Sequence, residues 1–243
     1  MAQHVEIDTL RDVQPWAPHQ AYSFPKVGIA NRPSLAERIN KDIALDLLEV
    51  DIDTLKGPLF EQVWGDAGGS LPRLSTLAWT VAQPLAYVLS IGFSGESCGA
   101  YCEGFSIHCN YDLRTGERLQ FDSLFTHVGF VAVNDLVEKR WSMVVEREIA
   151  LLEDTLRKHG RSAEEREELT ASLNLYKTCL AERSGVRPYV EDFDMLRNEL
   201  WLRVARCSAH VERDADTLGS VVMALPYADI ARYMRPEALA LIR

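Results

Sequence analysis

FSIHCNYDLRTGERLQF, residues 105–121, is the stretch of sequence that decides the fold. Its first half alternates strictly: the apolar positions are Phe105, Ile107, Cys109 and Tyr111, and the polar positions between them are Ser106, His108 and Asn110. This period of two is typical of a strand with one buried and one wet face. Turn-forming residues follow from Asp112 to Glu117, and residues 118–121 lead back. The stretch therefore predicts a β-hairpin.

Strand character recurs on both sides of this hairpin. Upstream it marks residues 74–82 and 86–93, and downstream it marks residues 200–205 and 220–225. Short connections between neighbouring strands favour antiparallel pairing. The strands together predict a mostly antiparallel sheet.

Helices are indicated by apolar residues that recur every three or four positions, in residues 34–47, 128–158 and 162–180. Capping boxes are predicted at the first of these, with Ser34 and Glu37, and at the third, with Ser162 and Glu165. A last helix is interrupted near Pro236. We therefore expect an α+β fold: a mostly antiparallel sheet packed against helices, with a long helix followed by a helical hairpin.

The domain organisation is predicted from composition. Residues 1–33 are rich in proline and aromatic residues and are expected to form an extended N-terminal arm. Residues 34–243 are expected to form a single α+β domain with a helical insertion near 128–184.

The charge balance excludes one class of partner. The chain has 243 residues and a formal net charge of −10, whereas binding to phosphate backbones requires a cationic surface. Nucleic acid is therefore not expected as a partner, and a basic protein is favoured instead. The sequence has neither the pattern of a signal peptide nor the roughly 18 apolar residues of a membrane span, so no membrane association and a cytoplasmic location are expected. Five scattered cysteines are then expected to be thiols.

One short motif matches a class of enzyme. Residues 95–99 have the pattern G-x-S-x-G, which presents a nucleophilic serine, here Ser97, between a strand and a helix. An alternating strand follows this motif instead of a helix, so a connection between strands is the preferred interpretation. His210, Asp214 and Asp216 could form an acid–base group, but loop hydrogen bonding and helix or turn capping account for such residues far more often and are the preferred explanation. We expect no enzymatic activity and no cofactor.

The cysteine and histidine residues are candidate ligands for a structural metal. The candidate ligands are Cys98, Cys102, Cys207 and His210, with His108 and Cys109 close in sequence to the first pair. Their spacing is not that of a known zinc finger or ribbon, and His108 faces away from Cys109. Buried thiols and a hydrogen-bonded histidine are the preferred explanation, so no metal is expected.

Acidic residues around aromatic or glycine-rich connections are candidates for binding a basic partner, because aromatic side chains are common anchors at interfaces. The residues chosen are Glu96, Tyr101, Glu103, Glu191, Asp192 and Asp194. Much of the charge lies on mixed-sign helix faces that require no partner.

Several segments resemble a known bacterial domain family. They are LSIGF at 89–93, CGAY at 98–101, NYDLRTGE at 110–117, LQFDSLF at 119–125 and LPYADI at 225–230. The family forms the C-terminal part of a peptidoglycan deacetylase and the extracellular, lysozyme-sensing part of an anti-sigma factor. The similarity spans residues 75–235, and the helices around 162–184 look like an insertion relative to that family.

The resemblance implies a role in binding. In that family the domain has no known catalytic centre, and its best understood role is to plug the active site of another protein. No lysozyme-contacting residue can be carried over to this sequence. With the acidic charge, the resemblance implies an immunity protein that neutralises a cognate bacterial toxin, most simply a basic toxin domain. The alternatives are a hydrolase using Ser97, a metal-dependent enzyme using Cys207 and His210, and a sensory ligand-binding domain.

Overall fold

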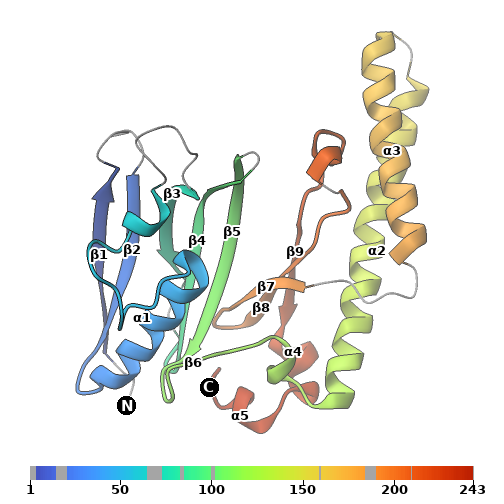
Figure 1. Ribbon diagram of the computed structural model, residues 1–243. Coiled ribbons are helices and arrows are strands. Elements are labelled where there is room, and N and C mark those ends of the chain that lie inside the picture. Colours follow the sequence, from blue (N-terminus) through green and yellow to red (C-terminus); the bar gives the residue numbers. More distant parts are fainter. Residues whose placement is uncertain are drawn as a thin grey trace. The chain divides into compact units, whose positions relative to one another are not determined.

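The computed structural model describes residues 4–14, 21–64, 73–82, 85–99, 102–158, 160–183, 190–208 and 210–242 (Figure 1). The chain divides into two compact units. The first comprises Met1–Gln120, Asp194–Asn198 and Glu237–Arg243, and the second comprises Phe121–Phe193 and Glu199–Pro236. Among the described residues, no helix combines the length and the apolar character needed to cross a membrane.

The first unit is built on a six-stranded sheet whose strands lie in the order of the sequence. They are β1 (Val5–Val13), β2 (Ala21–Ile29), β3 (Leu74–Val81), β4 (Val88–Cys98), β5 (Cys102–Asp112) and β6 (Glu117–Arg118). All pairs are antiparallel except β2 and β3, which are parallel and meet at Tyr22 and Leu77. Much of the segment expected as an extended arm thus forms a hairpin of β1 and β2 that belongs to the sheet.

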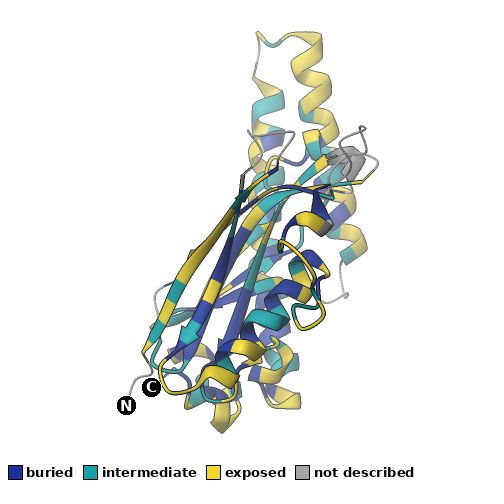
Figure 2. Ribbon diagram, turned by 60° about the vertical axis from the view of Figure 1, so that its left-hand side comes forward, coloured by how far each residue is buried: buried dark blue, intermediate teal, exposed yellow. Residues whose placement is uncertain are grey.

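One face of this sheet is covered by α1 (Pro33–Leu48), as Figures 1 and 2 show. Ile39 and Ile43 on α1 are fully buried with Ile91 and Tyr111 on β4 and β5, so the predicted apolar face of the hairpin lies in the core. Burial of such side chains supplies the main stabilising term.

The predicted capping box at the start of α1 does not form. The helix begins at Pro33, and the preceding residue, Arg32, makes no side-chain hydrogen bond to the helix end. Proline favours the first helical position because its ring fixes φ and it lacks the N–H that a cap would satisfy. Ser34 therefore lies two positions after the N-cap, Arg32, and cannot cap the helix.

The second unit combines two long helices with a three-stranded sheet. Its elements are α2 (His127–Arg157), α3 (Ala163–Arg183), β7 (Val190–Met195), β8 (Glu199–Val204), β9 (Val221–Pro226) and α4 (Tyr227–Ile230), and the short α5 (Pro236–Leu239) follows. The last two residues of β7, Asp194 and Met195, belong to the first unit. The α+β class, the long helix followed by another helix, and strands β8 and β9 confirm the sequence prediction. Strand β7 was not predicted: its sequence, VEDFDM, has two adjacent acids and no apolar–polar alternation over its first half.

The capping box at the start of α3 does form, and it carries a prediction. Ser162 Oγ accepts a hydrogen bond from the Glu165 N–H at 3.1 Å, and the Glu165 carboxylate accepts one from the Ser162 N–H at 2.8 Å. Replacement of Ser162 by alanine is expected to lower the free energy of unfolding by about 1 kcal/mol. Urea unfolding measures this change. Ser34→Ala is the matched control and is expected to alter stability by less than ~0.5 kcal/mol.

Candidate functional site

In the first unit, a polar cluster lies on the sheet face opposite α1. The predicted wet face of β5 carries Ser106 and His108, and both belong to this cluster. His108 Nδ1 lies 2.8 Å from Asp194 Oδ1, and Ser106 Oγ lies 3.4 Å from His108 Nε2. The side chain of His108 is 16% exposed and that of Asp194 only 7% exposed. The pair is therefore shielded from bulk water, whereas Ser106 is exposed.

Glycine at position 92 makes room for the imidazole. Gly92 on β4 lies directly opposite His108. A Cβ at Gly92 would lie 2.9 Å from His108 Cε1, closer than real Cβ atoms approach another atom, and 3.1 Å from Nδ1. The ring therefore lies against the backbone of β4, and this position places its two nitrogens toward Asp194 and Ser106.

A second set of hydrogen bonds holds the chain segment that carries Asp194. Asn110, which is buried beside His108 on the same strand face, accepts hydrogen bonds at Oδ1 from Ser90 Oγ and, at 3.3 Å, from the Met195 N–H. Because Met195 is the next residue after Asp194, this bond limits the movement of the carboxylate relative to His108. Orientation of a histidine by a carboxylate also selects its tautomer.

A hollow of about 680 Å³ opens on the same unit. It is lined by Arg11, Asp12, Val13, Tyr22, Ser23, Thr76, Leu77, Ala78, Ser94 and Gly95. Ser94 pairs directly with Ser106 across β4 and β5, so the hollow borders the polar cluster. Burial, with Asp12 nearby, raises the pKa of the Tyr22 phenol to about 12, so that this hydroxyl stays protonated and donates to the Leu74 carbonyl.

The second unit carries an exposed apolar surface, in contrast to the polar cluster of the first unit. Trp201, Val222 and Met143 are 37%, 51% and 59% exposed. A hollow of about 370 Å³ lies between α2 and β9 and is lined by Arg140, Met143, Val144, Arg147, Met223 and Ala224. Ala224 pairs with Trp201 across β8 and β9. We call Met143, Trp201, Val222 and Ala224 the β8–β9 patch.

In the predicted acid–base group, Asp216 belongs to a buried network of hydrogen bonds. Its side chain is fully buried and accepts hydrogen bonds from Tyr176 Oη and Ser208 Oγ at 2.9 and 2.7 Å. Asp214 is exposed, and the side chain of His210 lies outside the described residues. The described part of this group is therefore a buried hydrogen-bonding network around Asp216.

The predicted partner-binding acids are distributed over both units. Glu96 and Glu103 belong to the first unit, where the Glu96 carboxylate accepts a hydrogen bond from Ser75, and Tyr101 lies outside the described residues. Glu191 and Asp192 belong to the second unit and accept hydrogen bonds from Ser220 and Arg203 at 2.9 and 3.0 Å. Asp194 binds His108. Within each unit these acids are therefore engaged with neighbouring side chains.

The prediction that the cysteines are free thiols is wrong for four of them. Cys98 is bonded to Cys102, and Cys179 is bonded to Cys207. Cys98 and Cys102 lie opposite each other on β4 and β5, so the hairpin pairing itself brings their Cα atoms to 4.0 Å. Cys109 is free and buried, and burial raises the pKa of its thiol to about 11.

The disulfides include three of the cysteines that are candidate metal ligands, Cys98, Cys102 and Cys207. The potential ligand atoms of Glu96, Cys98 and Cys102 lie within 4.8 Å of one another. Zinc is bound by thiolates, and disulfide sulfurs are not thiolates. Cys207 is likewise bonded, so the cysteines proposed as ligands do not supply a zinc site in this structure.

Sequence reasoning missed the two groupings that the structure brings together. Alternation correctly placed Ser106 and His108 on one wet strand face, but Asp194 is 86 residues from His108 and no local pattern connects them. The β8–β9 patch likewise combines a helix residue with two strands. An exposed tryptophan within the alternating pattern of residues 199–204 was the available signal.

Neither the models of known families nor the curated proteins give a match to the sequence. Solved structures do match. A DUF3298 family protein from Pseudomonas aeruginosa PAO1 is similar over 97% of this chain and 96% of its own, with a TM-score of 0.59 and 13% identity. A member of the same family from Bacteroides fragilis is similar over 100% and 98%, with a TM-score of 0.54 and 11% identity. The chain thus has the fold of the bacterial DUF3298 family proteins.

Proposed function

We propose that the chain is a protein-binding, inhibitory module, an immunity protein that neutralises a cognate bacterial toxin by occluding its active site. The observation that carries this proposal is the β8–β9 patch. Exposed apolar residues that gather around an aromatic side chain mark protein interaction sites, whereas isolated ones do not. Tryptophan, methionine and arginine are enriched at interfaces and dominate their energetics.

The patch is already ordered for binding. Trp201 Nε1–H donates to the Glu199 carboxylate at 2.7 Å, so the polar atom of the indole is satisfied while the ring stays exposed. Arg140 donates to the Ala224 carbonyl at 2.8 Å and so joins α2 to β9. A preformed surface loses less conformational entropy when a partner binds.

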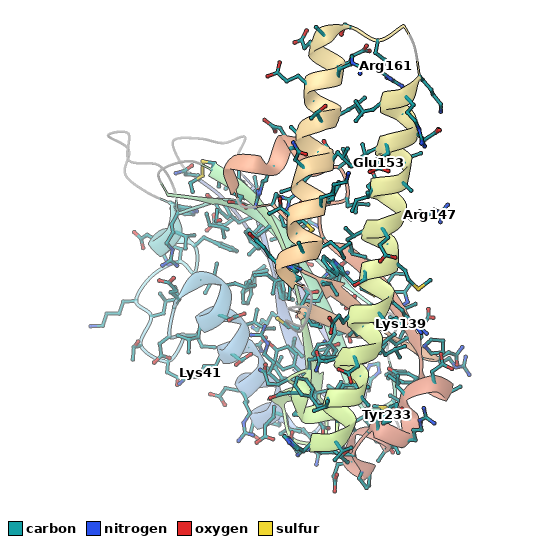
Figure 3. The ribbon with its side chains drawn as sticks, turned by 90° about the vertical axis from the view of Figure 1, so that its right-hand side faces the viewer. Lys41, Lys139, Arg147, Glu153, Arg161 and Tyr233 are labelled. Atoms are coloured by element: carbon teal, nitrogen blue, oxygen red, sulfur yellow. A yellow bond between two sulfur atoms is a disulfide. The ribbon has the colours of Figure 1, made fainter. Side chains whose placement is uncertain are left out.

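Two arginines of α2, Arg140 and Arg147, border this apolar centre. Arg147 projects from α2 (Figure 3) and lines the same hollow as Met143 and Ala224. Arg140 lies 3.4 Å from Asp229. A charged rim around an apolar centre is the usual organisation of a non-obligate interface. The net charge of −10 would speed the encounter with a basic toxin domain.

The disulfides bear on where this encounter takes place. Disulfides persist in oxidising compartments and are rare in a reducing cytosol. Two disulfides in one chain therefore favour an oxidising compartment over the cytoplasmic location that the sequence predicted. The proposal accordingly places inhibition of the toxin in such a compartment.

Replacement of Trp201 by alanine tests the patch. We expect the affinity for a toxin domain encoded next to this chain to fall about 30-fold, equivalent to ~2 kcal/mol for the loss of a central aromatic anchor. Isothermal titration calorimetry measures the change, and circular dichroism shows that the variant folds.

Leu45→Ala is the matched control, because Leu45 is an exposed apolar residue on α1 in the other unit. Its affinity is expected to equal that of the wild type. A Trp201→Ala variant that binds as tightly as the wild type would remove the patch from the proposal. A neighbouring toxin domain that is neither bound nor inhibited would remove the immunity function itself.

A further inference from the structure

From the polar cluster of the first unit we infer that the protein has a second activity: hydrolysis of short-chain carboxylic esters, with Ser106 as the nucleophile, His108 as the general base and Asp194 as the positioning residue. This inference concerns the first unit and does not depend on the binding of a toxin by the second.

The three side chains have the mutual arrangement that nucleophilic catalysis requires. With the Nδ1–H of a neutral imidazole donating to Asp194 at 2.8 Å, Nε2 carries the lone pair and faces the Ser106 hydroxyl at 3.4 Å. A separation slightly longer than a hydrogen bond is common for a nucleophile and its base in the absence of substrate. The roles follow from this geometry and do not depend on sequence order.

The neighbouring Asp194 carboxylate favours the charge separation that the reaction creates. When His108 takes the proton of Ser106, it becomes an imidazolium beside the Asp194 carboxylate. The Asp194 side chain is 7% exposed, so water screens this attraction little. Gly92 and Asn110 fix the ring and the Asp194 segment from two sides, so little reorganisation is needed during the reaction.

The neighbouring hollow supplies space for the acyl group. Its lining next to Ser106 consists of small side chains, Ser94, Ala78 and Thr76, which leave room for a short chain. Ser94 lies directly opposite Ser106, and both are exposed. The Ser94 hydroxyl, on the residue directly opposite the nucleophile, is a side-chain donor that can bind the carbonyl oxygen as it gains negative charge.

The reaction balances within these groups and water. Ser106 Oγ attacks the ester carbonyl carbon, and its proton passes to His108 Nε2. The carbon–oxygen bond of the leaving alcohol then breaks as that alcohol takes the proton from His108. Water attacks the acyl-serine with His108 again as base, and the acid and free Ser106 are released.

Labelling by a fluorophosphonate tests the nucleophile. The intact protein is incubated with the probe, digested and examined by mass spectrometry for the modified residue. We expect modification at Ser106, loss of labelling in Ser106→Ala, and unchanged labelling in Ser97→Ala, which removes the serine of the G-x-S-x-G motif. No labelling, or labelling that persists in Ser106→Ala, would overturn the inference.

Turnover of p-nitrophenyl butyrate tests the other two residues. We expect Ser106→Ala and His108→Ala each to lower kcat at least 100-fold, and added imidazole to restore part of the activity of His108→Ala but none of that of Ser106→Ala. Asp194→Asn should lower kcat while leaving KM within twofold, because it acts through the histidine. Hydrolysis unaffected by all three substitutions would overturn the inference, whereas binding of a toxin is unaffected in either case.

Discussion

Replacement of Asp216 by alanine is expected to lower the free energy of unfolding of the second unit by about 3–5 kcal/mol. The substitution removes one partner of a buried ion pair and leaves the other hydrogen-bond donors to Asp216 without an acceptor. Asp216 Oδ2 lies 3.3 Å from Arg206 Nε and accepts a hydrogen bond from Ser208 Oγ. Oδ1 accepts from Tyr176 Oη at 2.9 Å and from the Gly219 N–H at 3.0 Å. The carboxylate thus joins α3 to the loop between β8 and β9.

Urea unfolding at pH 7 measures this loss, and Asp214→Ala is the matched control. Asp214 is an exposed aspartate two residues away, and its replacement is expected to change stability by less than ~0.5 kcal/mol. Equal stability of the Asp216→Ala variant and the wild type would show that the network does not hold the unit together.

The same carboxylate predicts how stability depends on pH. Burial alone would raise the pKa of Asp216, but hydrogen bonds from Ser208, Tyr176 and the Gly219 N–H outweigh burial and hold the pKa below its ordinary value of 3.8. A carboxyl group whose pKa is lower in the folded state stabilises the protein above its unfolded pKa, and this contribution is lost as the pH falls through the folded value.

Unfolding curves recorded at pH 7 and at pH 3 test the sign of this dependence. We expect the wild type to lose stability between the two, and Asp216→Asn to lose less, because the asparagine does not titrate. A variant with the same pH dependence as the wild type would assign the acid sensitivity to other carboxyl groups.

The elements that the sequence predicted well are those with a local pattern. The hairpin of residues 105–121 has strict alternation followed by turn residues, and it forms β5 and β6 with Gly116 at a φ of 74°. The second capping box has its hydroxyl and its glutamate three residues apart and forms as predicted. At the first, the helix begins at Pro33, so the N-cap is Arg32, two residues before Ser34, and Ser34 does not occupy the capping position.

The candidate sites depend on contacts that no local pattern encodes. Ser106 and His108 share a strand face because they are two residues apart, and the sequence shows this directly. Their carboxylate partner comes from β7, and it was instead interpreted as a surface acid. Asp216 also depends on a distant residue, because its hydrogen-bond partner Tyr176 is 40 residues away on α3. Buried polar partners found across such distances require the tertiary fold.

Removal of the disulfide between Cys179 and Cys207 is expected to have the second large effect on the free energy of unfolding. It joins α3 to the segment after β8 across a sequence separation of 28 residues. By restricting the unfolded chain, closure of a loop of this length stabilises the fold by about 3.5 kcal/mol. The double variant Cys179→Ser, Cys207→Ser should lose this amount in urea unfolding. The Cys98–Cys102 disulfide closes a much shorter loop, so the variant Cys98→Ser, Cys102→Ser should lose only about 2 kcal/mol.

A thiol count decides whether these bonds exist in the isolated protein. The wild type, denatured without reductant, should react with one equivalent of a thiol reagent, because Cys109 is free and the other four cysteines are paired. Five equivalents would contradict the pairing and restore the interpretation as cytoplasmic thiols. Cys207 lies beside Ala205 and Arg206, whose carbonyls accept hydrogen bonds from Arg183 on α3 at 3.1 and 2.7 Å. The two segments are therefore held together independently of the sulfurs, so reduction should lower stability without unfolding the second unit.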